Sequence, residues 1–349
     1  MTYFKNAINL LAFIFLLSSC SKGTVTQPAN LAPANLSVTA VPATDGSGMV
    51  VFTATADNAV TYAYEFGNGD IKNAATGSIT YAYSLVGTYN YTVTVTAAGS
   101  TGLTATKSVA ITVTKVAAPP TLLWSDEFNT DGAPDPTKWG YDIGTGSNGW
   151  GNAELEYYTS RPDNVIVQGG YLKVTAKKEN YNGSGYTSAR LLSKDKFAFT
   201  YGKVEIKAKL PAGVGTWPAI WMLGSNISTA SWPSCGEIDI MEHLGRTLNT
   251  IYGTLHYPGH SGGSADGTTT VIDGATTAFH IYSLDWSATA IKIYVDGLLY
   301  HTTPNTAGIP FNHDFFLIVN MALGGNFGGP LDPAFTSGTL EVDYIRVYK

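Results

Sequence analysis

Apolar and polar residues alternate in short runs along residues 121–349, and the alternation has the period of a β-strand. In "IKIYVDGLLYH" (291–301), the pair Asp296-Gly297 is a two-residue turn of the kind that β-hairpins prefer. No segment has the pattern of a convincing amphipathic helix. We therefore expect two stacked antiparallel sheets here, in a β-jelly roll or a similar sandwich. Other expected strands are "YLKVTAKK" (171–178), "YGKVEIKAKL" (201–210), "FFLIVNMALGG" (315–325) and "LEVDYIRVYK" (340–349).

Residues 36–115 predict a second, smaller β-domain. They are rich in Thr, Val, Ala and Tyr, and the clearest strands are "YNYTVTVTA" (89–97) and "KSVAITVTK" (107–115). Short strands with turn signals on a span of this size indicate a small β-sandwich. The segment contains no His, no Cys and no carboxylate cluster, so we expect no catalysis there. Residues 116–120, "VAAPP", are the expected linker between the two domains.

The N-terminus is typical of an export signal. Lys5 is the only charge before a short apolar run, Leu10–Leu17, which is too short to span a membrane. "LSSC" (Leu17–Cys20) resembles a bacterial lipobox, which implies a signal peptide over residues 1–19 and lipidation of Cys20. An ordinary signal peptide cut near Ser19 is the alternative. Residues 20–35 are polar and rich in Pro and Ala, which indicates a flexible tether.

Lipidation of Cys20 would anchor the protein to a bacterial membrane, and we expect the outer membrane, with the periplasmic or outer face left open. Only Cys235 would then remain as a free thiol, so no intramolecular disulfide is possible. The chain has 349 residues, a net charge of −6 and no basic run, which argues against nucleic acid as a partner.

The stretch "GEIDIME" (236–242) crowds three carboxylates, Glu237, Asp239 and Glu242, into seven residues. In a helix, Glu237 and Glu242 would lie about 140° apart and could not face one substrate. The alternating Ile238 and Ile240 favour a strand. A regular strand would bury Glu242 in the core, where an unpaired carboxylate is costly. A β-bulge around Met241 would return all three carboxylates to one face.

Paired carboxylates on one face suit glycoside hydrolysis, in which one attacks the anomeric carbon and the other protonates the leaving oxygen. Asp239, between them, would orient a neighbouring Glu and raise the pKa of one member of the group. A Ca²⁺ cluster or an ordinary solvated strand face are the alternatives. Neither explains why three tryptophans lie just upstream, at Trp217, Trp221 and Trp232, where their rings would suit the flat C–H faces of sugars.

"GEIDIME", together with "YGKVEIKAKLPAGVGTWPAIWMLG" (201–224) and "NMALGG" (320–325), resembles glycoside hydrolase family 16, and within it the bacterial laminarinases. The resemblance runs from "WSDEFN" (124–129) to "VDYIRVYK" (342–349), so that residues 121–349 are the expected catalytic domain. It implies a concanavalin A-like jelly roll and a retaining endo-β-1,3-glucanase, with mixed β-1,3-1,4-glucan as a second candidate substrate. Glu237 matches the nucleophile, Asp239 the assisting carboxylate and Glu242 the acid/base.

The same resemblance implies a set of substrate-binding residues and a structural metal. No cofactor is implied for catalysis. Many family members hold one structural Ca²⁺, and its matching ligands are the carbonyls of Glu127 and Gly170 and the carboxylate of Asp343. The positions that match sugar-contacting residues are Asn152, Arg190, Trp217, Trp221, Trp232 and His256.

Residues 36–115 resemble a PKD-type immunoglobulin-like module through "YAYEFGNGD" (62–70) and "YAYSLVGTYNYTVTV" (81–95). Tyr64 and Asn68 replace a Trp and an Asp that are usual in that module. Such modules act as spacers or weak binders. We expect a monomer with a polysaccharide substrate. Two alternatives stay open: a family relative acting on agar, porphyran or carrageenan, and a carbohydrate-binding protein without catalysis.

Overall fold

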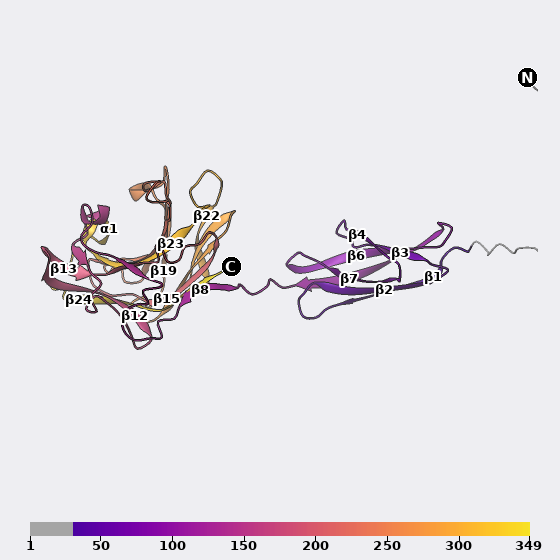
Figure 1. Ribbon diagram of the computed structural model, residues 1–349, viewed down its shortest axis with the longest axis horizontal. Helices are drawn as coiled ribbons and strands as arrows, with labels where there is room; N and C mark the ends of the chain where they lie inside the picture. Colours follow the sequence, from indigo (N-terminus) through magenta and orange to yellow (C-terminus); the bar gives the residue numbers. More distant parts are fainter. Residues whose placement is uncertain (1–30) are drawn as a thin grey trace, which may run out of the picture. The chain divides into compact units, whose positions relative to one another are not determined.

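The computed structural model describes residues 31–349 and divides them into two compact units between Pro119 and Pro120 (Figure 1). The expected signal peptide, Cys20 and most of the expected tether lie outside the described residues. Within the described part of the chain, no helix is long and apolar enough to cross a membrane. Each unit is described by itself below.

The first unit is a sandwich of two antiparallel sheets, as the alternation predicts (Figure 1). Strand β6 pairs with β7 over twelve residues without a register shift. Val93 and Val95 of β6 are buried, and Thr94, between them, bonds across the outer face to Ser108. One sheet has the order β1-β2-β5, with β1 (Ala34–Pro42), β2 (Met49–Asp57) and β5 (Ser78–Ala82). The other has the order β4-β3-β6-β7, with β3 (Thr61–Glu65), β4 (Ile71–Ala74), β6 (Gly87–Ala98) and β7 (Thr104–Lys115).

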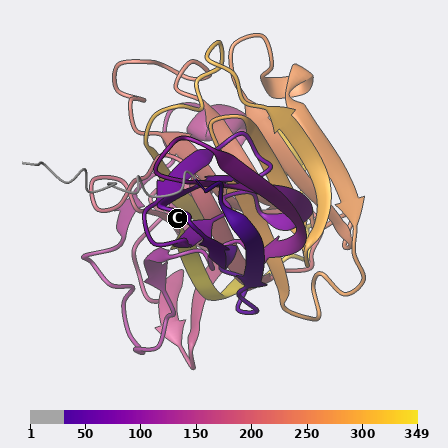
Figure 2. The same ribbon diagram turned by 90° about the vertical axis from the view of Figure 1, so that its right-hand side faces the viewer.

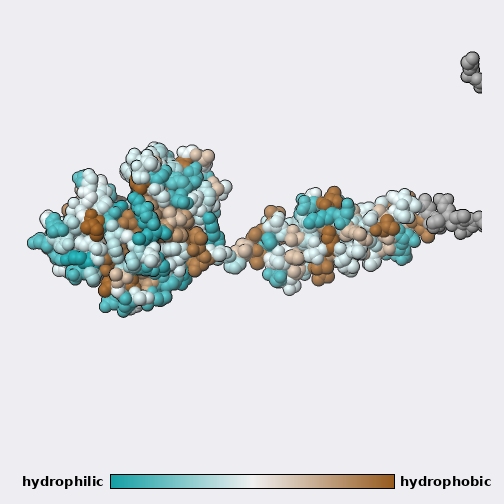
Figure 3. All heavy atoms as spheres, viewed as in Figure 1, coloured by the Kyte–Doolittle hydropathy of each residue, from teal (hydrophilic) through white to brown (hydrophobic). Residues whose placement is uncertain are grey.

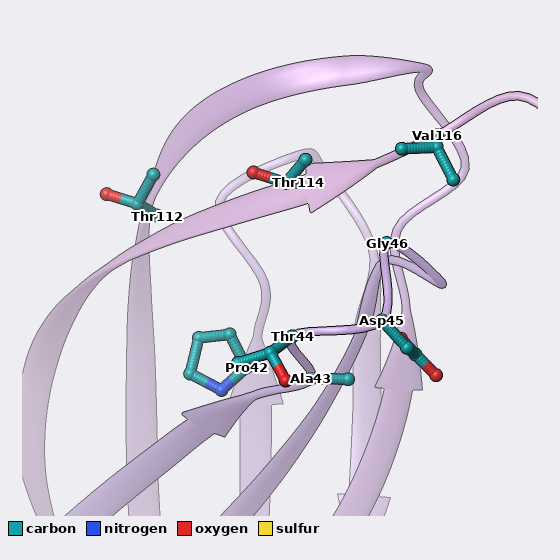
Figure 4. A pocket seen from close by; sticks show the side chains of 8 residues that line it. All are labelled: Pro42, Ala43, Thr44, Asp45, Gly46, Thr112, Thr114 and Val116. Carbon is teal, nitrogen blue, oxygen red and sulfur yellow. The ribbon is translucent and has the colours of Figure 1, made fainter.

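An open hollow of about 600 Å³ in this unit contains no carboxylate cluster (Figure 4). Asp45 is the one carboxylate that lines it. The other lining residues are Pro42, Ala43, Thr44, Gly46, Thr112, Thr114 and Val116.

The second unit consists of a ten-stranded and a seven-stranded sheet that enclose one hydrophobic core (Figures 1 and 2). The ten-stranded sheet has the order β10-β13-β12-β24-β15-β20-β21-β22, with β11 beside β12 and β8 beside β24. The seven-stranded sheet has the order β19-β18-β17-β16-β23-β14-β9.

The bounds of the strands in the ten-stranded sheet are β8 (Leu122–Asp126), β10 (Glu156–Tyr158), β11 (Val165–Gln168), β12 (Tyr171–Tyr181), β13 (Ser184–Ser188), β15 (Gly202–Lys209), β20 (His280–Trp286), β21 (Ala290–Val295), β22 (Leu298–Pro304) and β24 (Ser337–Tyr348). Those of the seven-stranded sheet are β9 (Gly140–Asp142), β14 (Arg190–Leu192), β16 (Thr216–Gly224), β17 (Glu237–His243), β18 (Thr250–His256), β19 (Asp266–Val271) and β23 (Phe315–Leu323). The helical segments of residues 31–349 are single turns: η1 (Gly149–Ala153), η2 (Gly262–Ser264) and α1 (Gly325–Gly328).

The sequence patterns of this unit are confirmed by the structure. The expected all-β sandwich is present, and the Asp296-Gly297 turn joins β21 to β22 with both residues at positive φ, 48° and 78°. Positive φ at both positions gives the turn a twist that matches the right-handed twist of the two strands. Cys235, immediately before β17, is buried and free.

Candidate active site

Strand β17 contains the β-bulge that the spacing of its carboxylates predicts. Against β18, Asp239 pairs with Thr254 and Glu242 pairs with Tyr252, so three steps on β17 match two on β18. The register with β16 shifts at the same place. Ile238, Ile240 and Met241 all point into the hydrophobic core. The extra residue therefore frees Glu242 from the core side and returns it to the face that carries Glu237 and Asp239.

Two tryptophans hold the outer carboxylates of the triplet. The indole Nε1 of Trp232 donates to Glu237 Oε2 at 3.1 Å, and Nε1 of Trp217 donates to Glu242 Oε1 at 2.9 Å. Trp217 belongs to β16, the neighbour of β17, and its ring packs edge-on against Phe327 of α1. Trp232 is 45% exposed, so its ring offers an accessible apolar surface beside Glu237. Figure 3 shows that the surface of the larger unit is hollowed at its upper side.

His256, at the end of β18, faces one carboxylate oxygen of Asp239 and one of Glu237. Its Nε2 lies 3.3 Å from Asp239 Oδ2 and 3.7 Å from Glu237 Oε1. The backbone N–H of Gly262 donates to Nδ1 of the same ring. Since Nδ1 accepts, Nε2 carries the proton and lies close to both carboxylates, without a hydrogen bond to Asp239 Oδ2. The imidazole thereby favours the ionised forms of the carboxylates that it faces.

The pKa values of all three carboxyl groups are raised, chiefly by burial. Burial and the neighbouring Asp239 raise the pKa of Glu237 to about 8, against opposing effects of His256 and Arg190. Burial and Asp239 likewise raise the pKa of Glu242 to about 8, and the hydrogen bond from Trp217 opposes the rise. Burial raises the pKa of Asp239 as well. The group therefore retains protons near neutral pH, as catalysis by a proton-donating carboxyl requires.

Arg190 forms part of an aromatic stack beside the triplet. Its guanidinium carbon lies 4.8 Å from the ring centres of both Trp150 and Trp221, and its Nε lies 3.0 Å from Asp142 Oδ2. Planar guanidinium groups stack favourably on indole faces. The side chain is consequently fixed on both faces and at one edge, with its charge near the cluster.

Asn152, in η1, belongs to a hydrogen-bond network that the sequence analysis missed. Its Nδ2 donates to Glu154 Oε1 at 3.2 Å, and Tyr158 donates to Glu154 Oε2 at 2.9 Å. Asn320 joins Tyr158 to the indole of Trp221. Glu154 and Tyr158 lie beside Asn152 in "GNAELEYYT" (151–159), and Asn320 lies in "NMALGG". Their positions in these two segments were the available signal.

Within residues 31–349, one group of side chains places three possible metal-ligating atoms within 4.8 Å of one another: Glu237, Asp239 and His256. Two carboxylates and an imidazole suit a transition metal such as Zn²⁺. The oxygens concerned are the ones that the proposed chemistry needs, so a metal bound there would block them.

The residues expected to bind Ca²⁺ lie on the other sheet. The pairs Ile345↔Asp126 and Val342↔Leu172 bring Glu127 and Gly170 beside residues 343–344 of β24. Oxygen donors of this type suit Ca²⁺. The carboxylate of Asp343, however, lies 2.6 Å from the Nζ of Lys207, so a bound Ca²⁺ would compete with that ammonium group.

Comparisons with known proteins agree with this geometry. The family model described as glycosyl hydrolases family 16 matches residues 153–346, which include the carboxylate triplet. A second model, described as beta-glucan synthesis-associated protein SKN1/KRE6/Sbg1, matches residues 49–237 and ends at the first of the three carboxylates.

Individual relatives are similar over about two thirds of this chain. A beta-glucanase of Rhodothermus marinus is 45% identical over 244 residues, which cover 65% of this chain and 85% of the relative. A glucan endo-1,3-beta-glucosidase A1 of Niallia circulans is 38% identical, and the match covers 65% of this chain and 38% of that protein. The solved catalytic domain of an endo-1,3-beta-glucanase (laminarinase) from Thermotoga petrophila RKU-1 is 42% identical, with a TM-score of 0.63, covering 67% of this chain and 99% of that one.

Proposed function

Because the chain belongs to the family 16 glycosyl hydrolases, we propose that it is a retaining endo-glycosidase that hydrolyses β-1,3-glucan, and also mixed-linkage β-1,3-1,4-glucan. The chain is a glycoside hydrolase, and its relatives include endo-1,3-β-glucanases and laminarinases. The bulge in β17 carries the mechanistic part of the proposal, because it gives one strand face two catalytic glutamates with an aspartate between them.

In the proposed reaction, Glu237 attacks the anomeric carbon and forms a covalent glycosyl-enzyme, while Glu242 gives its proton to the departing glycosidic oxygen. Glu242 then takes a proton from water, which attacks the anomeric carbon and releases Glu237 with retained configuration. Burial, and after it the negative charge of Asp239, raises the pKa of Glu242 and keeps Glu242 protonated before the first step. Burial strengthens each of these electrostatic effects, because little water screens them.

Substrate binding is assigned to the aromatic and polar side chains around the triplet. The exposed ring of Trp232 and the half-buried ring of Trp221 suit stacking on pyranose rings. Asn152, Arg190, Trp217 and His256 complete the proposed set. Few basic groups adjoin the triplet, which favours a neutral glucan over a sulfated polysaccharide as the substrate.

A substrate panel tests this proposal. Reducing sugar should appear from laminarin, more slowly from mixed-linkage glucan, and not from agarose or carrageenan. The Glu237→Gln protein serves as the matched control for contaminating activity. Cleavage of agarose alone would overturn the glucanase assignment, and glucan binding without turnover by the unaltered protein would indicate a binding protein.

The N-terminal part of the proposal concerns location. We infer a signal peptide over residues 1–19, lipidation at Cys20, a tether to residue 35 and a PKD-like spacer over 36–115. We also propose that the protein is a monomer and that the membrane carrying it is the outer membrane. Cys20→Ala should release the protein from the membrane fraction into the soluble fraction, and mass spectrometry of the mature N-terminal peptide should find the acyl groups. An unmodified N-terminus beginning after Ser19 would contradict the anchor.

A structural Ca²⁺ is proposed at Glu127, Gly170 and Asp343, with Lys207 displaced. Binding to the native state alone would raise the melting temperature of the catalytic unit in Ca²⁺ relative to a chelator. The Asp343→Asn protein should lose this difference. Equal melting temperatures of the unaltered protein in both buffers would show that Lys207 alone satisfies Asp343.

A further inference from the structure

A second acidic pair, Glu154 and Glu156, lies in the catalytic unit outside the carboxylate triplet. Glu156 is fully buried, and its Oε2 accepts the backbone N–H of Leu323 at 2.8 Å. Its other oxygen, Oε1, has no hydrogen-bond partner. Burial, followed by the charge of the neighbouring Glu154, raises the pKa of Glu156. Glu156 accordingly keeps its proton.

From Glu154 a chain of hydrogen bonds leads to a tryptophan beside the triplet. Tyr158 donates to Glu154 Oε2 at 2.9 Å, and the Nδ2 of Asn320 donates to the Tyr158 oxygen at 3.0 Å. The Oδ1 of Asn320 accepts from Nε1 of Trp221 at 2.8 Å. Tyr158 and Asn320 are 0% and 5% exposed, so water does not substitute for these partners.

The groups at the two ends of the chain, the Glu154 carboxylate and the Trp221 indole N–H, set the direction of the bonds between them. An ionised carboxylate only accepts, so the Tyr158 proton must point at Glu154. The Tyr158 oxygen is then free to accept from the Asn320 amide nitrogen, and the amide oxygen must face Trp221. If the carboxylate became an amide, Tyr158 or Asn152 would meet a donor instead of an acceptor. The hydroxyl of Tyr158 would then lose the acceptor that holds it in place beside Asn320.

We propose that Glu154 is a positioning residue for the substrate, which fixes the indole of Trp221 through Tyr158 and Asn320 and the amide of Asn152 by direct contact. The inference rests on the proposed function, in which Trp221 and Asn152 contact the glucan. Arg190 holds the face of the Trp221 ring, and the chain from Glu154 holds its N–H edge. Neither Glu154 nor Tyr158 needs to touch the sugar to act in this way.

Kinetics on laminarin oligosaccharides test the inference. Glu154→Gln should raise KM about 10-fold with kcat changed less than about 3-fold, the effect of losing one charge-assisted hydrogen bond from the bound state. Tyr158→Phe breaks the chain at its next link and should raise KM similarly. Glu156→Gln should stay within about 2-fold of the unaltered protein, because a Gln amide imitates a protonated carboxyl. Glu341→Gln, on the other sheet, is the matched control.

A double-mutant cycle separates positioning from general destabilisation. In a Trp221→Phe background, which lacks the indole N–H, Glu154→Gln should raise KM by clearly less than the rise of about 10-fold expected for it alone, because only its contact with Asn152 remains to be lost. Full additivity of the two substitutions would overturn the relay, the chain of hydrogen bonds from Glu154 through Tyr158 and Asn320 to Trp221. Melting temperatures identify any variant that fails to fold, and Tyr158→Phe then carries the cycle in place of Glu154→Gln.

An NMR measurement needs no substrate. In protein labelled with ¹⁵N at tryptophan, the indole signal absent from Trp221→Phe identifies Trp221. That signal should shift in Glu154→Gln and Tyr158→Phe and stay in place in Glu341→Gln. An unmoved signal would overturn the inference even if the enzyme cleaves laminarin. An unaltered protein that cleaves no laminarin would count against the proposed function, and the NMR result would still decide the relay.

Discussion

Strand β6 of the first unit and strand β17 of the second are built from the same alternation of apolar and polar residues, and they differ at one place. In β6 the alternation is unbroken, with Val93 and Val95 inside and Thr94 outside. In β17 one extra residue interrupts it between Asp239 and Glu242. On the outer face of the unbroken strand β6, threonine hydroxyl groups such as that of Thr94 face solvent. The interrupted strand gathers three carboxyl groups whose pKa values are all raised.

The difference shows how little backbone change separates a regular sheet face from one that gathers carboxyl groups. Both units bury apolar side chains between two sheets, and both therefore satisfy the same rule of sheet packing. The alternation of inward and outward side chains breaks only where Ile240 and Met241 both face the core, and this break lies between the carboxylates Asp239 and Glu242. Departures from local regularity are expected at functional sites, where the stability lost is tolerated for activity.

The largest expected effect follows from removing the nucleophile on the interrupted strand. Glu237→Gln should lower kcat on laminarin by at least about 10⁴-fold, since an amide cannot form the glycosyl-enzyme. Glucan binding, measured by titration calorimetry, should persist because the cleft keeps its shape. Residual activity above one per cent of the unaltered protein, about 10²-fold more than expected, would place the nucleophile elsewhere.

Removing the proton donor should cost less, and the cost should depend on the leaving group. Glu242→Gln should lower kcat on laminarin by about 10²–10⁴-fold. An aryl glucoside with an acidic phenol departs without a proton, so its rate of glycosyl-enzyme formation should fall far less. Stopped-flow release of the phenol measures this step. Equal losses on both substrates would contradict the assignment of Glu242 as the acid.

The pH dependence of kcat/KM tests the role of Asp239, which lies between Glu237 and Glu242. Because the pKa values of Glu237 and Glu242 are both raised to about 8, kcat/KM should peak near that pH, since the nucleophile Glu237 is protonated below it and the acid Glu242 loses its proton above it. The pKa of Glu242 therefore sets the alkaline limb. Asp239→Asn removes a charge that raises this pKa, so the alkaline limb should move to lower pH. Asp163→Asn, an exposed position, is the control. An alkaline limb that stays in place in Asp239→Asn would show that burial alone sets the pKa.

The smallest effect on catalysis is expected from interrupting the regular strand. One Ala inserted between Thr94 and Val95 would turn Val95 outward and Thr96 inward, because the side-chain period of a strand is two. The first unit should lose several kcal/mol, roughly the range of severe core disruption. Its calorimetric transition should move to lower temperature or vanish, while the rate on soluble laminarin stays within about 2-fold, in line with the independence of the two cores. A large loss of activity would show that the units depend on each other.

Much of the fold and the triplet followed from sequence, because strand period and turn residues are local properties. The bulge at Met241 was predictable because an unpaired Glu242 in the core has no low-energy alternative. The relay through Tyr158 and Asn320 was not predictable from pattern. Strand β23 is buried along its whole length, so Asn320 shows no alternation that would mark it as facing Trp221. Its role depends on partners that are distant in sequence and brought together only by the sheet.

The extra residue in β17 also limits how this site can change over generations. Substitutions alter side chains one at a time, but the count of residues between Asp239 and Glu242 changes only when a whole codon is gained or lost. A descendant protein that keeps the number of residues between Asp239 and Glu242 therefore keeps the β-bulge. The spacing should therefore persist in a lineage long after the surrounding residues have diverged, and it offers a marker of descent more durable than percentage identity.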